Sequence, residues 1–356
     1  MYYLGIDHHK RFSQVAVMDE KGKIRINSSM VNEKASFESL KEILKEPCKA
    51  VVEAGRNWGV MYDLLEELGI ETVVAHPLKG RAIAEAKIKF DSIDASTLAH
   101  LLRANLIPPV HVPPKEIREQ KNLLRHRVWL IRLQTMTENR IHQLIDRNHV
   151  KAPKVKNLFG VAGRKLLQAL NLSGIDQKLL SDHLQLLDTL QEHIKKAEAW
   201  IEKELKDNPL IAVLNTLPGF GKVLSALAAL EIDDINGFAT KAKFASYCSL
   251  IPSTFASGGK LYHGDLIPTG NRWLKYVFIE ASWVAIRTSP YCRAYFDRIK
   301  RGKGPNVAIV ALARRLSEIA YRCLKGERYY VEHPYIPYTR QTPCGCPPKF
   351  LASQGL

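Results

Sequence analysis

The chain has 356 residues, 46% of them hydrophobic, which is enough for two domains or for one domain with an appended helical region. Lys and Arg number 52 against 36 Asp and Glu, giving a net charge of +16. No stretch approaches roughly 18 uncharged apolar residues and the N-terminus lacks a signal-peptide pattern, so we expect neither a membrane span nor secretion. The six scattered cysteines suit a reducing cytoplasm.

The first 107 residues alternate between short apolar stretches and helical patterns. Strands are predicted at 2–6, 13–18, 23–28, 49–53 and 70–75, and helices at 33–46, 58–68 and 92–106, with a short helix after Pro77. Three antiparallel strands followed by alternating helix and strand favour an α/β domain with RNase H-like sheet order over residues 1–107. An actin-like kinase half begins with the same pattern, so the pattern alone does not decide the function.

Proline and helical patterns divide the rest of the chain. The segment "PPVHVPP", residues 108–114, is the predicted domain boundary. Residues 115–207 are predicted to be a long helical arm, because apolar residues recur at threes and fours, as in an antiparallel pair or a coiled-coil oligomerisation region. Residues 208–330 are predicted to be a mainly α-helical domain, and 331–356 a proline-rich tail. The lone Cys344-Gly-Cys346 in this tail lacks the second ligand pair that a zinc site needs.

The positive charge is concentrated outside the first domain. Residues 1–114 contain 15 basic and 15 acidic residues, whereas 115–157 contain 11 basic and 4 acidic, and 257–330 contain 14 basic and 5 acidic. Clustered positive charge is the usual electrostatic footprint of a phosphate-backbone partner. A single basic helix would more simply be a solvated face, but two such segments favour a nucleic-acid partner.

Four acidic residues stand where the first domain would hold a metal. Asp7 ends the first predicted strand and Glu53 the fourth, while Asp91 and Asp94 lie three apart and share one face of the next helix. Paired divalent cations about 3.5–4 Å apart clamp the attacking and leaving oxygens of a phosphodiester, and they prefer such oxygen ligands. The four acids therefore predict a two-metal phosphodiester site. Taken singly, Asp91 or Asp94 could cap a helix, and Glu53 could pair with Arg56.

The stretch "LNTLPGFGKVLSALAALEI", residues 214–232, has the form of a helix-hairpin-helix turn. Glycines in such a turn let backbone amides approach a phosphate, and Lys222 adds positive charge at the helix start. A plain packing joint between two helices is an equally good interpretation of this segment alone.

A second glycine-rich stretch lies at residues 250–283. Ser257 precedes two glycines in a predicted loop, with Lys260 and His263 close in sequence. A serine in a basic, glycine-rich loop can be a nucleophile toward a phosphate, although most loop serines are only turn formers. Arg272 and Lys275 stand near the start of the following helix, where they suit contacts with a nucleic-acid backbone.

Together these motifs resemble the insertion-sequence one-ten family of DEDD transposases, which is related to the Piv/MooV invertases. The resemblance covers roughly residues 2–330. The segments "GID" at 5–7, "VVEAGRNWG" at 51–59 and "KFDSIDASTLAHLL" at 89–102 are similar to the family's four-acid motif in its RuvC-like domain. The segments "LPGFGKVLSALAALEI" and "SLIPSTFASGGKLYHGDLIPTGNRWLKYVFIEA" are similar to its C-terminal transposase domain.

The resemblance implies that Asp7, Glu53, Asp91 and Asp94 hold Mg²⁺, with Mn²⁺ as a substitute, and that Ser257 is the nucleophile. In that family the serine attacks a DNA phosphate and forms a covalent phosphoserine intermediate. The acids of one subunit act with the serine of another in a dimer or tetramer bridged by helical arms. A structured guide RNA encoded beside the gene pairs with donor and target DNA. The resemblance further implies a prokaryotic, nucleoid-associated protein.

Three other interpretations stay open. A RuvC-like metal-dependent endonuclease or resolvase would use the same acids, with Ser257 only structural. A nucleic-acid scaffold would use its acids for structure alone. An actin-like kinase would share the strand pattern, but it would need a second phosphate-binding glycine turn and would leave the basic C-terminal region unexplained. His8 and His9, directly behind the first acid, receive no role from the sequence.

Overall fold

The computed structural model describes the whole chain except residues 56, 84–90, 152–154, 206–207, 258–259 and 333–356. The chain forms two compact units, Met1–Arg118 and Glu119–Leu356. The proline-rich tail, including Cys344 and Cys346, lies almost entirely outside the described residues. In the part of the chain that is described, no helix is long and apolar enough to cross a membrane.

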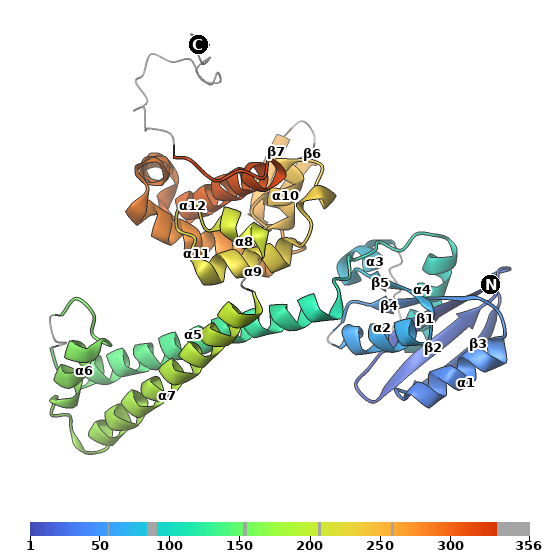
Figure 1. The fold of residues 1–356 in the computed structure, drawn as a ribbon, viewed down its shortest axis with the longest axis horizontal. Helices are drawn as coiled ribbons and strands as arrows, with labels where there is room; N and C mark the ends of the chain where they lie inside the picture. The colour runs from blue at the N-terminus through green and yellow to red at the C-terminus, as the bar shows by residue number, and fades with distance from the viewer. Residues whose placement is uncertain (56, 84–90, 152–154, 206–207, 258–259, 333–356) are drawn as a thin grey trace, which may run out of the picture. The chain divides into compact units, whose positions relative to one another are not determined.

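The first unit is built on a five-stranded sheet with the order β3-β2-β1-β4-β5 (Figure 1). Strands β1, β2 and β3 are antiparallel neighbours, whereas β4 and β5 run parallel to β1. The strands span Tyr2–His8 (β1), Phe12–Met18 (β2), Ile24–Val31 (β3), Cys48–Glu53 (β4) and Glu71–Ala75 (β5). The predicted strands are thus present, each with bounds shifted by no more than a few residues.

Helices cover both faces of this sheet. Helices α1 (Lys34–Leu44) and α2 (Trp58–Glu67) pack on one face, against the buried side chains of Leu4, Ile6 and Val52. Helix α4 (Asp91–Arg103) packs on the other face, and α3 (Pro77–Ile83) follows β5. Because side chains alternate along a strand, odd-numbered positions of β1 and β4 face α4 and even-numbered positions face α1 and α2.

Helix α4 lies unusually close to the central strand. A Cβ atom placed on Gly5 would stand 2.0 Å from the carbonyl oxygen of Ala95 and 2.5 Å from the backbone nitrogen of Ala99. Glycine on the strand and alanines on the helix therefore allow the two backbones to touch. This contact fixes the start of α4 relative to the end of β1.

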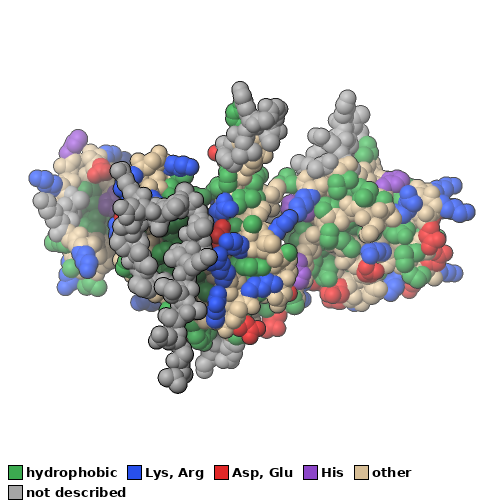
Figure 2. Space-filling model, turned by 90° about the horizontal axis from the view of Figure 1, so that it is seen from above, with side chains coloured by type: hydrophobic (Ala, Val, Ile, Leu, Met, Phe, Trp, Pro, Cys, Tyr) green, Lys and Arg blue, Asp and Glu red, His purple; other side chains and the backbone are tan. Residues whose placement is uncertain are grey.

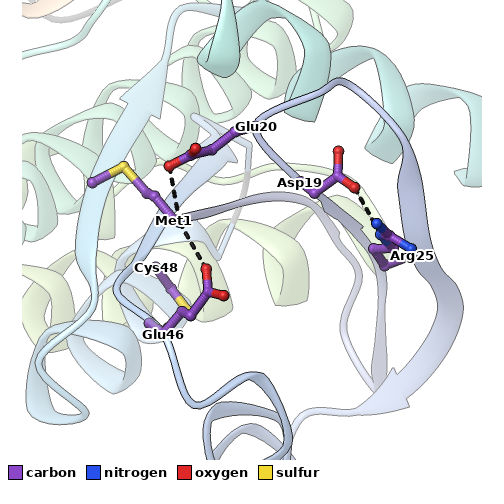
Figure 3. A network of polar contacts seen from close by, with 6 residues as sticks. All are labelled: Met1, Asp19, Glu20, Arg25, Glu46 and Cys48. Carbon is purple, nitrogen blue, oxygen red and sulfur yellow. Dashed lines mark hydrogen bonds and ion pairs between the residues drawn. The ribbon is translucent and has the colours of Figure 1, made fainter.

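Several ion pairs lie at the end of the sheet where β1 begins (Figure 3). The terminal ammonium of Met1 donates to Glu20 at 3.1 Å and to Glu46 at 2.8 Å, and Arg25 Nε donates to Asp19 at 2.7 Å. These groups are exposed or lie near the surface, so each pair contributes little to stability. The charged groups at this end of β1 thus pair with one another.

The second unit begins within the long helix α5 (Lys115–Arg147). After the short α6 (Val161–Gln168), helix α7 (Gly174–Glu204) returns along α5. Near the end of the two helices that α6 connects, Ile141 and Ile145 pack against Leu184. Toward the other end, Leu130 packs against Ile194. Two long helices therefore form an antiparallel hairpin with its own apolar seam.

The remainder of the second unit is mainly helical. Its helices are α8 (Pro209–Leu214), α9 (Lys222–Ile232), the 3-10 turn η1 (Ile235–Gly237), α10 (Lys241–Tyr247), α11 (Arg272–Thr288) and α12 (Pro290–Lys325). Phe244 and Phe278 are fully buried and meet edge to face. The turn between α8 and α9 contains Gly219 at a φ of 80°, and a Cβ there would stand 1.9 Å from the carbonyl oxygen of Ala281 in α11. Helix α12 bends at Gly304, which also has a φ of 80° and precedes Pro305.

The predicted loop around Ser257 differs from the structure. Strands β6 (Pro252–Ser257) and β7 (Lys260–Leu266) form an antiparallel hairpin, in which Ser257 pairs with Lys260. Ser257 is therefore the last residue of a strand. The sequence contains the reason, because Thr254, Phe255 and Tyr262 favour strands and a two-residue Gly-Gly connection suits a tight hairpin.

Candidate metal centre

Two of the predicted acids stand at the ends of adjacent parallel strands. Ile6 of β1 is in register with Val52 of β4, so Asp7 and Glu53 both follow at the carboxyl edge of the sheet. Alternation along the strands assigns both positions to the face that α4 covers. Asp7 is half-buried, with its side chain 24% exposed, and Glu53 is also half-buried.

Helix α4 supplies the other two acids. It begins at Asp91, and both Asp91 and Asp94 lie in its first turn, where the helix dipole favours negative charge. Because α4 touches β1 at Gly5, this first turn reaches the end of β1. Residues from three separate segments of the chain thus meet at one edge of the sheet.

The closest grouping at this edge contains a residue that the sequence analysis left without a role. His9 Nε2 lies 3.3 Å from Asp7 Oδ2 and 3.1 Å from Asp91 Oδ2. One potential ligand atom from each of the three residues lies within 4.8 Å of the other two, as in a metal site. Asp94 and Glu53 are not part of this trio, although Asp94 is close enough to influence Asp7 electrostatically.

Burial and neighbouring negative charge disfavour the ionised form of Asp7. Burial raises the pKa of Asp7, and the nearby carboxylates of Asp91 and Asp94 raise it further, against an opposing effect of His9. A raised carboxyl pKa means that the protein environment disfavours the ionised form. A bound cation would relieve that cost, because it stabilises the ionised carboxylate directly.

The turn after β1 is held by a chain of hydrogen bonds. Ser13 Oγ donates to Asn32 Oδ1 at 2.6 Å, so its lone pair accepts from His8 Nδ1 at 2.9 Å. Asn32 Nδ2 in turn donates to the carbonyl oxygen of His9 at 2.8 Å, and the His9 ring rests against Phe12 at 5.1 Å between ring centres. Burial, with a contribution from His9, lowers the pKa of His8 and favours its neutral form. These contacts fix the backbone and the ring position of His9.

The donor set at this edge fits a divalent cation. Carboxylates suit hard cations such as Mg²⁺, and imidazole is a common ligand of transition metals. His9 Nε2 is buried and has no hydrogen-bond partner among the described residues, although it lies between two carboxylates. A buried polar atom without a hydrogen bond is compatible with a bound cation or water at this position.

The basic residues predicted to contact nucleic acid lie in the second unit. Lys222 is 83% exposed at the start of α9 and donates to Glu202 at 2.9 Å. Arg272 is exposed at the start of α11, and Lys275 is half-buried one turn later. The side chains of Ser257 and Lys260 lie outside the described part of the structure.

Helices α5 and α11 present a cluster of arginines and aromatic rings that the sequence analysis did not identify. Arg125, Arg132 and Arg272 all place their guanidinium groups 5.3–5.9 Å from the ring centre of Trp273. On the face that Figure 2 presents, Lys and Arg side chains predominate over the helices of the second unit, whereas both charges mix over the first. Such stacking of arginine on aromatic rings is typical of nucleic-acid surfaces, but it requires the packing of two helices remote in sequence.

The sheet order and the acids at its carboxyl edge define the first unit as an RNase H-like domain. Family comparisons agree with this class. A DEDD transposase model of the IS110 group, described as "Transposase", matches residues 4–150, and the model of the "Transposase IS116/IS110/IS902 family" matches residues 211–297. The two models together span more than half of the chain. The chain therefore belongs to the IS110 family of transposases.

Curated relatives match over different lengths. The "Insertion element IS116 uncharacterized 44.8 kDa protein" of Streptomyces clavuligerus is 24% identical over 95% of this chain and 98% of its own. The "Transposase for insertion sequence element IS1328" of Yersinia enterocolitica is 23% identical over 89% of this chain and 95% of its own. The "Insertion element IS110 uncharacterized 43.6 kDa protein" of Streptomyces coelicolor is 33% identical, but the match spans only 36% of that protein and 40% of this chain.

Proposed function

We propose that this transposase cuts and rejoins DNA strands with a divalent cation, Mg²⁺ or Mn²⁺, held by Asp7, Glu53, Asp91 and Asp94. The observation that carries the proposal is the approach of Asp7 and Asp91, from separate segments, to the two sides of His9 Nε2.

The proposed chemistry divides between the cation and the chain. When bound, the cation supplies charge stabilisation to the oxygens of the reacting phosphodiester. Asp7 and Asp91 bind and orient it, while Glu53 and Asp94 complete the acidic edge. The contact between Gly5 and Ala95 sets the separation of the two acidic segments. Positional errors of about 1 Å cost roughly 100-fold in rate, which makes that contact part of the catalytic design.

Ser257 is the proposed nucleophile. Its hydroxyl oxygen forms a bond to the DNA phosphorus as the bond from phosphorus to a deoxyribose oxygen breaks. The serine proton is lost and the released deoxyribose oxygen gains one, so the step is balanced and the strand stays linked to the protein. A second deoxyribose hydroxyl then reverses the exchange and rejoins the strand. The position of Ser257 at the end of β6, paired with Lys260 across the hairpin, supports this role because it places the serine at a strand tip.

The proposed partners follow from charge, exposed apolar residues and family resemblance. The basic excess of the second unit suits DNA and a structured guide RNA, and the guide RNA itself rests on resemblance alone. Several large apolar side chains are exposed on the α5–α7 hairpin, including Trp129 (52%), Met136 (64%) and Trp200 (54%). Exposed apolar residues on a long helical pair favour a homo-oligomer, a dimer or tetramer, joined through this arm.

The test is the Ser257→Ala variant of the full chain, incubated with labelled donor DNA and the RNA that co-purifies with the protein. We expect the denaturant-resistant protein–DNA adduct and strand exchange to be lost, while DNA binding is retained. Ser253→Ala is the matched control, since Ser253 lies on the same strand and its hydroxyl donates to the carbonyl oxygen of Asp265 at 2.9 Å. Strand exchange by Ser257→Ala at the normal rate would show that the serine is structural, and would leave the hydrolytic nuclease as the better interpretation.

A further inference from the structure

His9 is placed where a cation at the acidic edge would be bound. Its Nε2 atom faces the carboxylates of both Asp7 and Asp91, at 3.3 and 3.1 Å. The side chain as a whole is 39% exposed, yet Nε2 itself is buried and forms no hydrogen bond with any described residue. The exposed part of the ring is therefore the part away from the acids.

The three side chains are spaced as ligands of a single cation. One potential ligand atom from each of Asp7, His9 and Asp91 lies within 4.8 Å of the other two, and the two contacts to His9 Nε2 are 3.3 and 3.1 Å. A cation bound at about 2.1 Å to each of three such atoms is compatible with this spacing.

The surroundings hold His9 in this position. The backbone N–H of His9 donates to the carbonyl oxygen of Phe12 at 3.1 Å, and Asn32 Nδ2 donates to the His9 carbonyl. The Phe12 ring supports the imidazole from one side. A ring that is held in position before the metal binds loses little entropy on binding.

We propose that His9 is a direct ligand, so that one cation of the acidic site is held by Asp7, His9 and Asp91 through two carboxylate oxygens and one imidazole nitrogen. This inference rests on the proposed divalent-cation function. An imidazole favours first-row transition metals over Mg²⁺, whereas an all-oxygen site suits Mg²⁺. The site consequently prefers Mn²⁺ to Mg²⁺ more strongly than four acids alone would.

The experiment uses metal-free full-length protein titrated with Mn²⁺. Pulsed EPR detects the magnetic coupling between bound Mn²⁺ and a ligand nitrogen, and the free-Mn²⁺ signal gives the dissociation constant. We expect nitrogen coupling in the wild type and its loss in His9→Ala and in His9→Gln, which offers an amide oxygen instead. Mn²⁺ affinity should fall on the order of 10- to 100-fold in His9→Ala, with a smaller loss for competing Mg²⁺.

Two further variants make the outcomes distinguishable. His100→Gln removes an exposed histidine from the last turn of α4 and should retain both the coupling and the affinity. Asp7→Asn should abolish Mn²⁺ binding. Binding that depends on Asp7 but shows no nitrogen coupling in the wild type would overturn the role of His9 and leave the cation site standing. Equal, weak binding by the wild type and Asp7→Asn would overturn the cation site itself. The wild-type spectrum decides the role of His9 even if a His9 variant fails to fold.

Discussion

We predict that the substitution Gly5→Ala moves helix α4 away from strand β1. In Gly5→Ala the new Cβ would stand 2.0 Å from the Ala95 oxygen, and real Cβ contacts require at least about 3.0 Å. Since both contacting groups are backbone, α4 must move away from β1 by about 1 Å. Overpacking of this kind costs about 1–3 kcal/mol, which corresponds to roughly 4–12 °C in unfolding temperature at about 4 °C per kcal/mol.

The same displacement should reduce strand-exchange activity by more than the loss of folding stability alone would. Moving α4 carries Asp91 and Asp94 away from Asp7, and an error of about 1 Å costs roughly 100-fold in rate. Calorimetry of the full chain and a strand-exchange assay at 25 °C, where the variant stays folded, would measure the two effects.

Gly80→Ala is the matched control for this experiment. A Cβ at Gly80, in α3, would meet no described atom within 4 Å, and alanine is favoured over glycine in a helix by about 1 kcal/mol. We expect this control to unfold at the same or a higher temperature and to keep its activity. If Gly5→Ala behaves like Gly80→Ala in both assays, the close approach does not position the acids.

Two further predictions concern buried charge. The pKa of Asp7 is raised in the folded state, so the protein binds the Asp7 proton more tightly when folded than when unfolded. Protonated Asp7 therefore contributes to the free energy of unfolding below the unfolded-state pKa. This contribution is lost as pH rises through the folded-state pKa, and the ionised carboxylate then opposes folding. Asp7→Asn should therefore raise the unfolding temperature of chelator-treated protein at pH 7, with the gain shrinking toward pH 4, and no gain at pH 7 would contradict this reasoning. Arg125→Ala removes the arginine that pairs with the carboxylate of Glu231, which is 3% exposed, and should cost about 3 kcal/mol in urea unfolding. Arg127→Ala should cost less than about 1 kcal/mol, because its partner Glu198 is 41% exposed; equal losses would refute the argument.

Much of the first unit was predictable from local patterns. The strands and helices were predicted because each carries an apolar period that matches its structure. The placement of Asp7 and Glu53 at one edge of the sheet was predictable because neighbouring parallel strands end at a common edge. Two apolar residues within the predicted helices 33–46 and 92–106 are nevertheless exposed: Ile43 at 68% and Leu106 at 52%. Leu106 lies beyond the end of α4 at Arg103, where Asn105 adopts a left-handed conformation (φ of 54°) that stops the helix.

The position of His9 between two carboxylates and the buried pair of Arg125 and Glu231 could not be predicted in the same way. Each depends on the distance between side chains from segments far apart in the sequence. Nothing in the letters "DHHK" distinguishes His8, which faces Ser13, from His9, which faces two acids.

The length of the β6–β7 hairpin determines how far Ser257 stands from the base of the hairpin. Its base is clamped, since Ile267 donates to the carbonyl oxygen of Ile251 and Asn271, the cap of α11, donates to that of Tyr247. Ser257 stands five residues beyond Pro252, or about 17 Å of extended strand from that base. Removing two residues from each strand would preserve the face on which the serine stands and shorten its reach by about 7 Å. The length of this hairpin thus sets how far the proposed nucleophile, Ser257, stands from the helices at the base of the hairpin.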